Sequence, residues 1–121
     1  MNNNTDSSPL FICKPADDTS VGIISFSIPV LAAAQNEQLT AEFLALTAQN
    51  KYDNYILDLS SIKMLSNQTL SVFLQLRKLV ETRGKIAISG IDPDLYRVFK
   101  ITGLHNLFLF LRNNEEAVQT F

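Results

Sequence analysis

The chain has 121 residues, a hydrophobic content of 46% and a formal net charge of −2 at pH 7. This length suits a single domain with one modest core. A slightly acidic chain lacks the basic surface of a dedicated nucleic-acid-binding protein. No apolar run reaches the roughly 18 residues of a membrane span, and the first residues do not resemble a signal peptide. We therefore expect a cytoplasmic protein that binds no nucleic acid and inserts into no membrane.

The N-terminal part of the chain combines a polar segment with two candidate strands. Residues 1–8 are small and polar and predict a disordered tail, which leaves 9–121 for the folded domain. Residues 10–15 and 21–28 are rich in β-branched and aromatic side chains and predict two strands joined by a turn. The single cysteine, Cys13, excludes a disulfide framework, and we expect it to pack in the first strand as a small hydrophobe.

The middle of the chain predicts one helix and one buried strand. Residues 30–38 are ambiguous, because their alanines favour a helix but no clear cap precedes them. Residues 39–50 have apolar side chains at helical spacing, with Thr40 as the candidate cap. A buried strand is expected around residues 54–60.

The C-terminal half predicts helices with clear boundaries. Residues 66–83 form the clearest one, with Ser66 as the N-cap and Gly84 just beyond its end. A second helix has Asp92 as its cap and Gly103 as its stop, with Pro93 in its first turn. The remaining elements are two short strands and a terminal helix capped by Asn113 or Asn114, and they occupy residues 85–90, 107–111 and 113–121.

Strands that alternate with helices predict an α/β domain with a mainly parallel sheet. We expect the first two strands to pair locally as an antiparallel edge. The predicted fold is therefore a single α/β domain in which about four helices cover a central mixed sheet of about five strands.

Helix 66–83 has an unusually wide apolar surface. Its polar side chains fall within an arc of about 100°, and nearly all the rest of the circumference is apolar. A helix that lies on one sheet face needs an apolar stripe only slightly wider than 100°, so this stripe is about twice as wide as needed. Val72 and Leu79 lie at the boundary of this stripe, beside Gln68 and Gln75. They are expected to face either a neighbouring helix of the same domain or a separate partner.

The polar residues 66–69 join the buried strand to this helix. The first N–H groups of a helix lack intrahelical partners and attract negative charge. Ser66 therefore has two interpretations: a simple cap, or a hydroxyl that carries or binds phosphate, with Thr69 beside it at the third helical position. Asp58 precedes the joint and is the acid expected nearest to Ser66. Its role is either a loop hydrogen bond or the tuning of a kinase contact.

The histidine, the acidic residues and the glycines of the chain do not form the pattern of a catalytic, metal-binding or phosphate-binding site. His105 is the only histidine, and no nucleophile or orienting acid accompanies it as a catalytic triad requires. The acids show no metal-ligand spacing, and the four glycines form no phosphate-binding loop. We therefore expect a non-enzymatic protein without a metal or cofactor.

Two stretches resemble the STAS domain, the family named for sulfate transporters and anti-sigma factor antagonists. They are "YILDLSSIKMLSNQTLSVFLQL" and "VFKITGLHNLFLFLRNNEEAV", within a resemblance that covers about residues 10 to 121. In the antagonist branch, Asp-Ser-Ser-Gly-Leu-Gly opens the helix, and one serine is phosphorylated by a partner kinase that is also the anti-sigma factor. The resemblance places Ser66 at the aspartate, Asn67 and Gln68 at the serines, and Thr69 and Ser71 at the glycines, on either side of Leu70.

This resemblance implies a switch site without its usual phosphorylated serine. The neutral Gln68 stands at the phosphoserine position and mimics the unphosphorylated state. A partner would then bind constitutively, unless Ser66 or Thr69 takes the phosphate or the site is silent. The implied function is a regulatory module that binds an anti-sigma factor, a serine kinase or another signalling protein. The alternatives are an accessory subunit of a lipid transporter and a self-associating scaffold.

Overall fold

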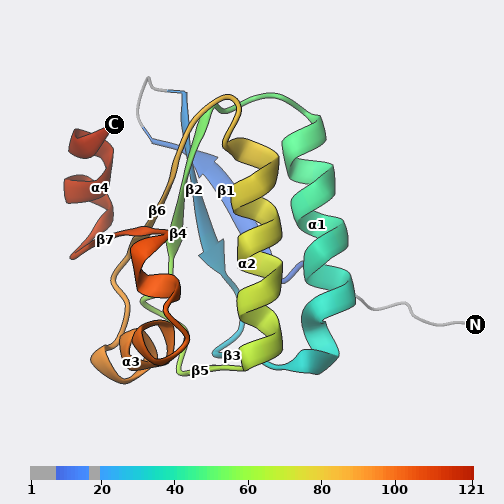
Figure 1. Cartoon of the computed structure of the whole chain (residues 1–121). Helices are drawn as coiled ribbons and strands as arrows, with labels where there is room; N and C mark the ends of the chain where they lie inside the picture. Colours follow the sequence, from blue (N-terminus) through green and yellow to red (C-terminus); the bar gives the residue numbers. More distant parts are fainter. Residues whose placement is uncertain (1–7, 17–19) are drawn as a thin grey trace, which may run out of the picture.

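The computed structural model describes residues 8–16 and 20–121, so all of the predicted tail 1–8 except Ser8 lies outside the described part. Ser8 is exposed, yet its carbonyl oxygen accepts a hydrogen bond of 2.9 Å from Gln38 Nε2. The described residues form a five-stranded mixed sheet, a separate two-stranded pair and four α-helices (Figure 1). This confirms the predicted α/β architecture.

The five-stranded sheet has the order β1-β2-β4-β6-β7. Its strands are β1 (Phe11–Pro15), β2 (Val21–Phe26), β4 (Asn54–Asp58), β6 (Ile86–Ser89) and β7 (Leu109–Leu111). β1 pairs with β2 in the antiparallel direction, as predicted, and every other pair is parallel. A second, parallel pair joins β3 (Val30–Leu31) to β5 (Met64–Leu65), which the sequence did not predict.

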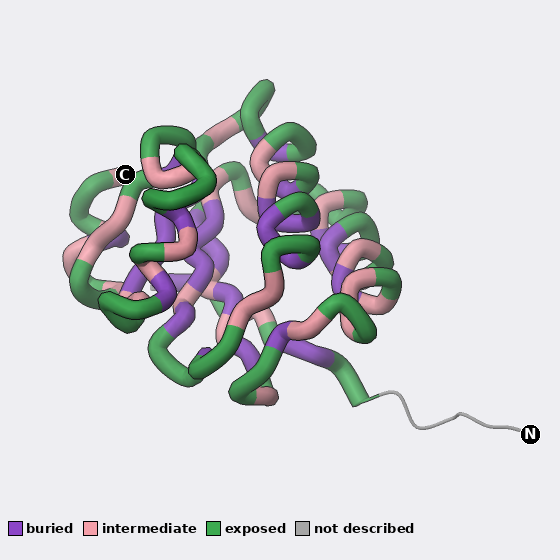
Figure 2. Tube along the Cα trace, turned by 60° about the horizontal axis from the view of Figure 1, so that its bottom comes forward, coloured by how far each residue is buried: buried purple, intermediate pink, exposed green. Residues whose placement is uncertain are grey.

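The helices are distributed unequally over the two faces of the sheet. They are α1 (Asn36–Ala48), α2 (Asn67–Val80), α3 (Pro93–Ile101) and α4 (Asn114–Thr120). The first three each connect two neighbouring parallel strands and pack into one large core. Right-handed crossovers that advance in the same direction along a sheet place their helices on the same face. α4 covers part of the opposite face over a smaller cluster (Figures 1 and 2). The short 3₁₀ turns η1 (Ala33–Gln35) and η2 (Leu104–Asn106) complete the chain.

Local signals explain the helix boundaries that were predicted. The Asp92 side chain accepts a hydrogen bond from the Asp94 amide at the start of α3, and Gly103 follows this helix with a φ of 77°. Asn113, the first of the two candidate caps, accepts from the Glu116 amide at the start of α4.

Two boundaries differ from the prediction. α1 begins at Asn36, so Thr40 lies inside the helix and does not cap it. α2 ends at Val80, and a turn separates it from Gly84, which does not adopt a positive φ. A side chain at residue 84 would overlap the carbonyl oxygen of Asp53. Gly84 is therefore needed for the close approach of two chain segments and not for a left-handed cap.

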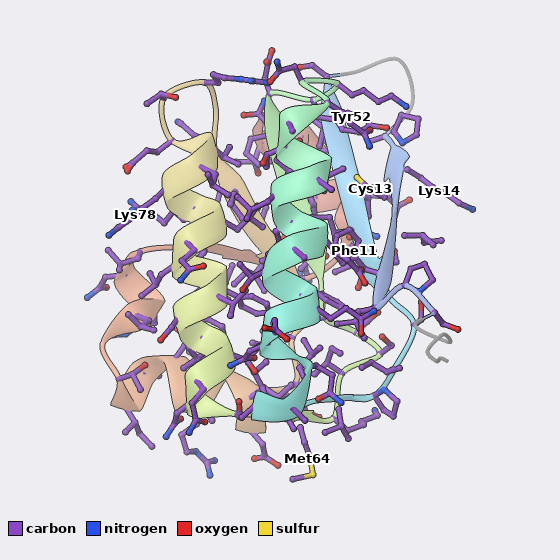
Figure 3. All side chains as sticks on the ribbon, turned by 90° about the vertical axis from the view of Figure 1, so that its right-hand side faces the viewer. Phe11, Cys13, Lys14, Tyr52, Met64 and Lys78 are labelled. Carbon is purple, nitrogen blue, oxygen red and sulfur yellow. The ribbon has the colours of Figure 1, made fainter. Side chains whose placement is uncertain are left out.

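The outer edge of β1 contains a proline. Ala16 N donates to Val21 O and Ser27 N donates to Leu10 O, so the even-numbered residues of this strand pair with β2. The odd-numbered residues, including Pro15, then direct their backbone groups outward, because antiparallel pairing alternates. Proline fits there since no ladder bond is lost. Cys13 packs against the core, as expected, and burial raises the pKa of its thiol to about 11 (Figure 3).

Candidate functional site

The start of α2 is closed by its own side chains. Ser66 has an extended backbone, with φ −77° and ψ 156°, and its Oγ accepts a hydrogen bond of 3.1 Å from the Thr69 amide. The two hydroxyl oxygens, Ser66 Oγ and Thr69 Oγ1, lie 2.8 Å apart. Ser66 is therefore the N-cap, as predicted, and Thr69 supports it from the third helical position.

Thr69 also anchors this first turn to distant parts of the chain. Its side chain is completely buried, and Oγ1 lies 3.2 Å from Leu31 O and 2.9 Å from Asn36 Oδ1. The Ser66 amide donates to the same Leu31 carbonyl at 2.9 Å. The start of α2 is thus fixed on β3 and on the first residue of α1. Phosphate transfer to Thr69 would require this turn to open, whereas Ser66 is only half-buried.

An uncharged polar surface lies outside this anchor. Asn67, Gln68 and Ser71 are exposed, and the first turn of α2 contains no acidic residue. Met64 of β5 projects from this end of the molecule (Figure 3). Met64 is 63% exposed, and Val30, its partner on β3, is 37% exposed. The amides can hydrogen-bond to a partner, and the two apolar side chains can lose water against it. This combination suits protein recognition.

Asp58 does not join this surface. The alternation of β4 places Asp58 on the same face as Ile56, which packs in the α4 cluster, whereas Leu57 faces the large core. Asp58 Oδ1 accepts from the amide and the hydroxyl of Ser60 at 3.0 and 2.7 Å, and Oδ2 accepts from Asn114 Nδ2 at 2.9 Å. The loop hydrogen bond was one of the two predicted roles, and it is confirmed. The contact with α4 was not predicted.

Sequence reasoning missed two partners of the site. Leu31 and Asn36 fell in the ambiguous segment 30–38, and they contact Thr69 across 38 and 33 residues of chain. The only available signal was the candidate hydroxyl of Thr69, at a position where the resemblance expects a glycine. A threonine there fills space and adds a hydrogen-bonding group, so a partner from another segment was to be expected.

Replacing Thr69 by valine tests this anchor. Valine keeps the shape but removes the hydroxyl, so the polar atoms around it lose a buried partner, which costs about 1–2 kcal/mol of unfolding free energy. Thr69→Ser keeps the hydroxyl and serves as the control. Urea unfolding followed by circular dichroism measures both. If the valine variant is as stable as the wild type, the hydroxyl network does not stabilise the first turn.

The described residues 8–16 and 20–121 contain no cluster of three or more His, Cys, Asp or Glu side chains that could hold a metal ion. His105 is half-buried in η2, and its ring packs edge-on against Tyr96 with the ring centroids 6.4 Å apart. In the same part of the chain, no helix is both long enough and apolar enough to cross a membrane.

Comparison with solved structures shows the same fold in other proteins. A candidate anti-sigma factor antagonist from Thermotoga maritima matches with a TM-score of 0.80 and 19% identity, over 91% of this chain and 92% of that one. The phosphorylated form of the Bacillus cell fate determinant SpoIIAA matches with a TM-score of 0.68 and 17% identity, over 91% and 97% of the two chains. At these identities the likeness establishes the fold alone.

A transporter also contains this fold. The murine anion transporter Slc26a9 matches with a TM-score of 0.66 and 19% identity, over 87% of this chain but only 18% of the transporter. No curated protein sequence matches the chain. The model of the STAS domain, in contrast, matches residues 16–118. The chain therefore belongs to the STAS domain family.

Proposed function

We propose that this protein is a non-enzymatic regulatory module of the anti-sigma factor antagonist type. It acts in the cytoplasm and binds an anti-sigma factor, a serine kinase or a related signalling protein through the start of α2. The observation that carries the proposal is the exposed, uncharged surface of Asn67, Gln68 and Ser71 on a firmly anchored first turn. A preorganised surface loses little conformational entropy when a partner binds.

Gln68 determines how this surface is regulated. It is exposed and occupies the position at which the family's antagonists carry their phosphorylated serine, so binding is constitutive in this protein. Ser66 is the remaining candidate acceptor of phosphate at the surface. Thr69 is the less accessible candidate, because its hydroxyl is buried beneath the first turn.

The substitution Gln68→Glu tests the proposed interface. The added charge should weaken binding of an identified partner by about tenfold or more, since one desolvated charge costs over 1.4 kcal/mol. Stability should stay level or rise by roughly 0.3–1 kcal/mol, because an acid suits the start of a helix. Isothermal titration calorimetry and a thermal melt measure the two effects. Gln119→Glu makes the same chemical change at an exposed position on α4 and should leave the affinity unchanged. Its stability should fall slightly, because an acid in the last turn of a helix opposes the helix dipole.

One further result would identify a kinase partner, and another would exclude the start of α2 as the interface. Gln68→Ser should become a substrate of the partner if that partner is a family-type serine kinase, whereas the wild-type residue takes no phosphate. If Gln68→Glu leaves the affinity for a confirmed partner unchanged, the start of α2 is not the interface.

The alternative function is an accessory subunit of a membrane transporter, and the fold shared with part of Slc26a9 supports it. Affinity purification followed by mass spectrometry distinguishes the two. A kinase of the anti-sigma type supports the first proposal, and the ATPase of a lipid transporter supports the alternative. Recovery of the protein itself would indicate a self-associating scaffold.

A further inference from the structure

The hydroxyl of Tyr55 is a buried polar group with no hydrogen-bond partner among the described residues 8–16 and 20–121. Tyr55 lies on β4, and its side chain is 1% exposed within the large core. Buried polar groups in native proteins are almost always hydrogen-bonded, either to the protein or to ordered water. A hydroxyl left without any partner would destabilise the fold, because burial removes the water that it bonds in the unfolded chain.

The position of this hydroxyl is fixed by the packing of the Tyr55 ring. The ring meets that of Tyr52 edge-on, with the centroids 5.9 Å apart and an angle of 75° between the planes. The backbone of Tyr55 is paired on both sides, with Gly22 of β2 and with Ile86 of β6. A tightly packed side chain on a central strand cannot turn to reach a partner elsewhere, so a partner has to come to it.

A small cavity lies beside Tyr55, at the end of the domain where α1 and α2 both finish (Figure 1). The space open to the centre of a water molecule is about 10 Å³. One buried water needs roughly 10–15 Å³ measured in this way. Besides Tyr55, the lining includes the ends of both helices and the turns that follow them, through Thr47, Tyr52, Asp53, Val80 and Arg83.

The wide apolar stripe of α2 ends at this cavity. Val72 is 5% exposed and is buried in the core with Phe43 of α1, so it faces a helix of the same domain, which was one of the two expectations for the stripe. Leu79 lines the cavity and is 41% exposed. The cavity is therefore close to solvent on the side of α2, and a small molecule can reach it from there.

The cavity is polar, and its lining carries no net charge. Arg83 and Asp53 contribute one positive and one negative charge, which favours a neutral occupant over a halide or a metal ion. Thr47 Oγ1 donates to Phe43 O at 3.0 Å, so its lone pairs remain available to accept a hydrogen bond. The guanidinium group of Arg83 has N–H groups beyond the two that donate to neighbouring oxygens.

The Tyr55 hydroxyl is protonated at neutral pH and can both donate and accept. Burial raises the pKa of Tyr55 above its ordinary value, because the phenolate would lose its hydration. The hydroxyl proton therefore needs an acceptor, and the oxygen can accept in return.

We propose that this cavity binds one ordered water molecule, held by the hydroxyl of Tyr55. Water is neutral, fits a space of this size and both donates and accepts hydrogen bonds. Thr47 supplies a further acceptor and Arg83 a further donor, which together with Tyr55 gives the three hydrogen bonds typical of a buried water. The water links β4 to the ends of α1 and α2.

This site is separate from the proposed switch site at the start of α2. Eleven residues separate Gln68 from Leu79 along α2, which corresponds to about 16 Å of helix. The inference does not depend on the function proposed for the start of α2, so a negative result with Gln68→Glu would leave it unaffected.

A high-resolution crystal structure of the full-length protein tests the proposal directly. We expect density for one water molecule about 2.7–2.8 Å from Tyr55 Oη, within hydrogen-bond distance of Thr47 Oγ1 or the Arg83 guanidinium group. A dry cavity, or a direct bond between Tyr55 Oη and another protein atom, would overturn it.

The stability of Tyr55→Phe provides a second test, because the sign of the effect depends on whether the hydroxyl is bonded. If the hydroxyl holds a water molecule, its removal should lower the melting temperature by about 2–6 °C. Removal of an unbonded buried hydroxyl would instead leave the melting temperature unchanged or raise it, and that result would contradict the proposal. Tyr96→Phe makes the same change at a half-buried position on α3 and should shift the melting temperature by less than about 2 °C.

Discussion

Gly84→Ala should lower the free energy of unfolding by roughly 3 kcal/mol, near the upper end of the range for overpacking. A Cβ atom at residue 84 would overlap the backbone carbonyl of Asp53 and lie 2.5 Å from Asn54 Oδ1. Backbone atoms cannot turn away as a flexible side chain can. The Tyr55 amide also donates to Lys85 O at 3.0 Å, so relief of the overlap would disturb the register of β4 and β6.

Gly103→Ala is the matched control for this change. Gly103 has a φ of 77°, but a Cβ atom there would meet no other atom within 4 Å. The substitution therefore costs only the left-handed backbone strain of about 1–2 kcal/mol. Urea unfolding of both variants compares close packing with backbone strain. If Gly84→Ala is no less stable than Gly103→Ala, the contact with Asp53 does not constrain the fold.

Phe43→Ala should cost about 3–5 kcal/mol, the range for truncation of a large aromatic side chain in a core. Phe43 is 1% exposed, and its ring centroid lies 5.2 Å from that of Phe11 and 6.3 Å from that of Phe73. The side chain therefore connects β1, α1 and α2, and its loss leaves a cavity between these elements.

The neighbouring residue provides the control. Leu44 lies on the outer face of α1 and is 50% exposed, so Leu44→Ala should change stability by less than about 0.5 kcal/mol. Calorimetric unfolding of the two variants measures the difference. Equal losses would mean that α1 is packed differently from the arrangement described above.

The elements that were predicted correctly from the sequence are those whose boundaries are determined by residues nearby in the chain. The helix formed by α3 depends on Asp92, Pro93 and Gly103, each of which acts within a few residues of itself. Gly84 is the contrasting case. It was interpreted as a helix terminator, but its constraint comes from Asp53, which is 31 residues earlier in the chain. The two-residue strands β3 and β5 are too short to show any periodicity.

The candidate site also combines features set by nearby residues with features set by distant segments of the chain. The capping role of Ser66 follows from its place before an apolar helix, and it was predicted. The burial of Thr69 depends on Leu31 and Asn36, whose positions only the fold determines. For Asp58 the alternation of the strand was available in the sequence, since Ile56 and Asp58 must share a face. Proximity along the chain to Ser66 was the less reliable guide.

The proline at the edge of β1 has a consequence for aggregation. Exposed edge strands can recruit strands of other molecules, and native proteins blunt such edges with proline or with charge. Pro15 offers no donor at the outer edge, so an added strand could use only the amides of Phe11 and Cys13 within β1. The charged and exposed Lys14 lies between Cys13 and Pro15. The longer of the two outer strands of the sheet is thereby protected against the stacking of further strands at high protein concentration.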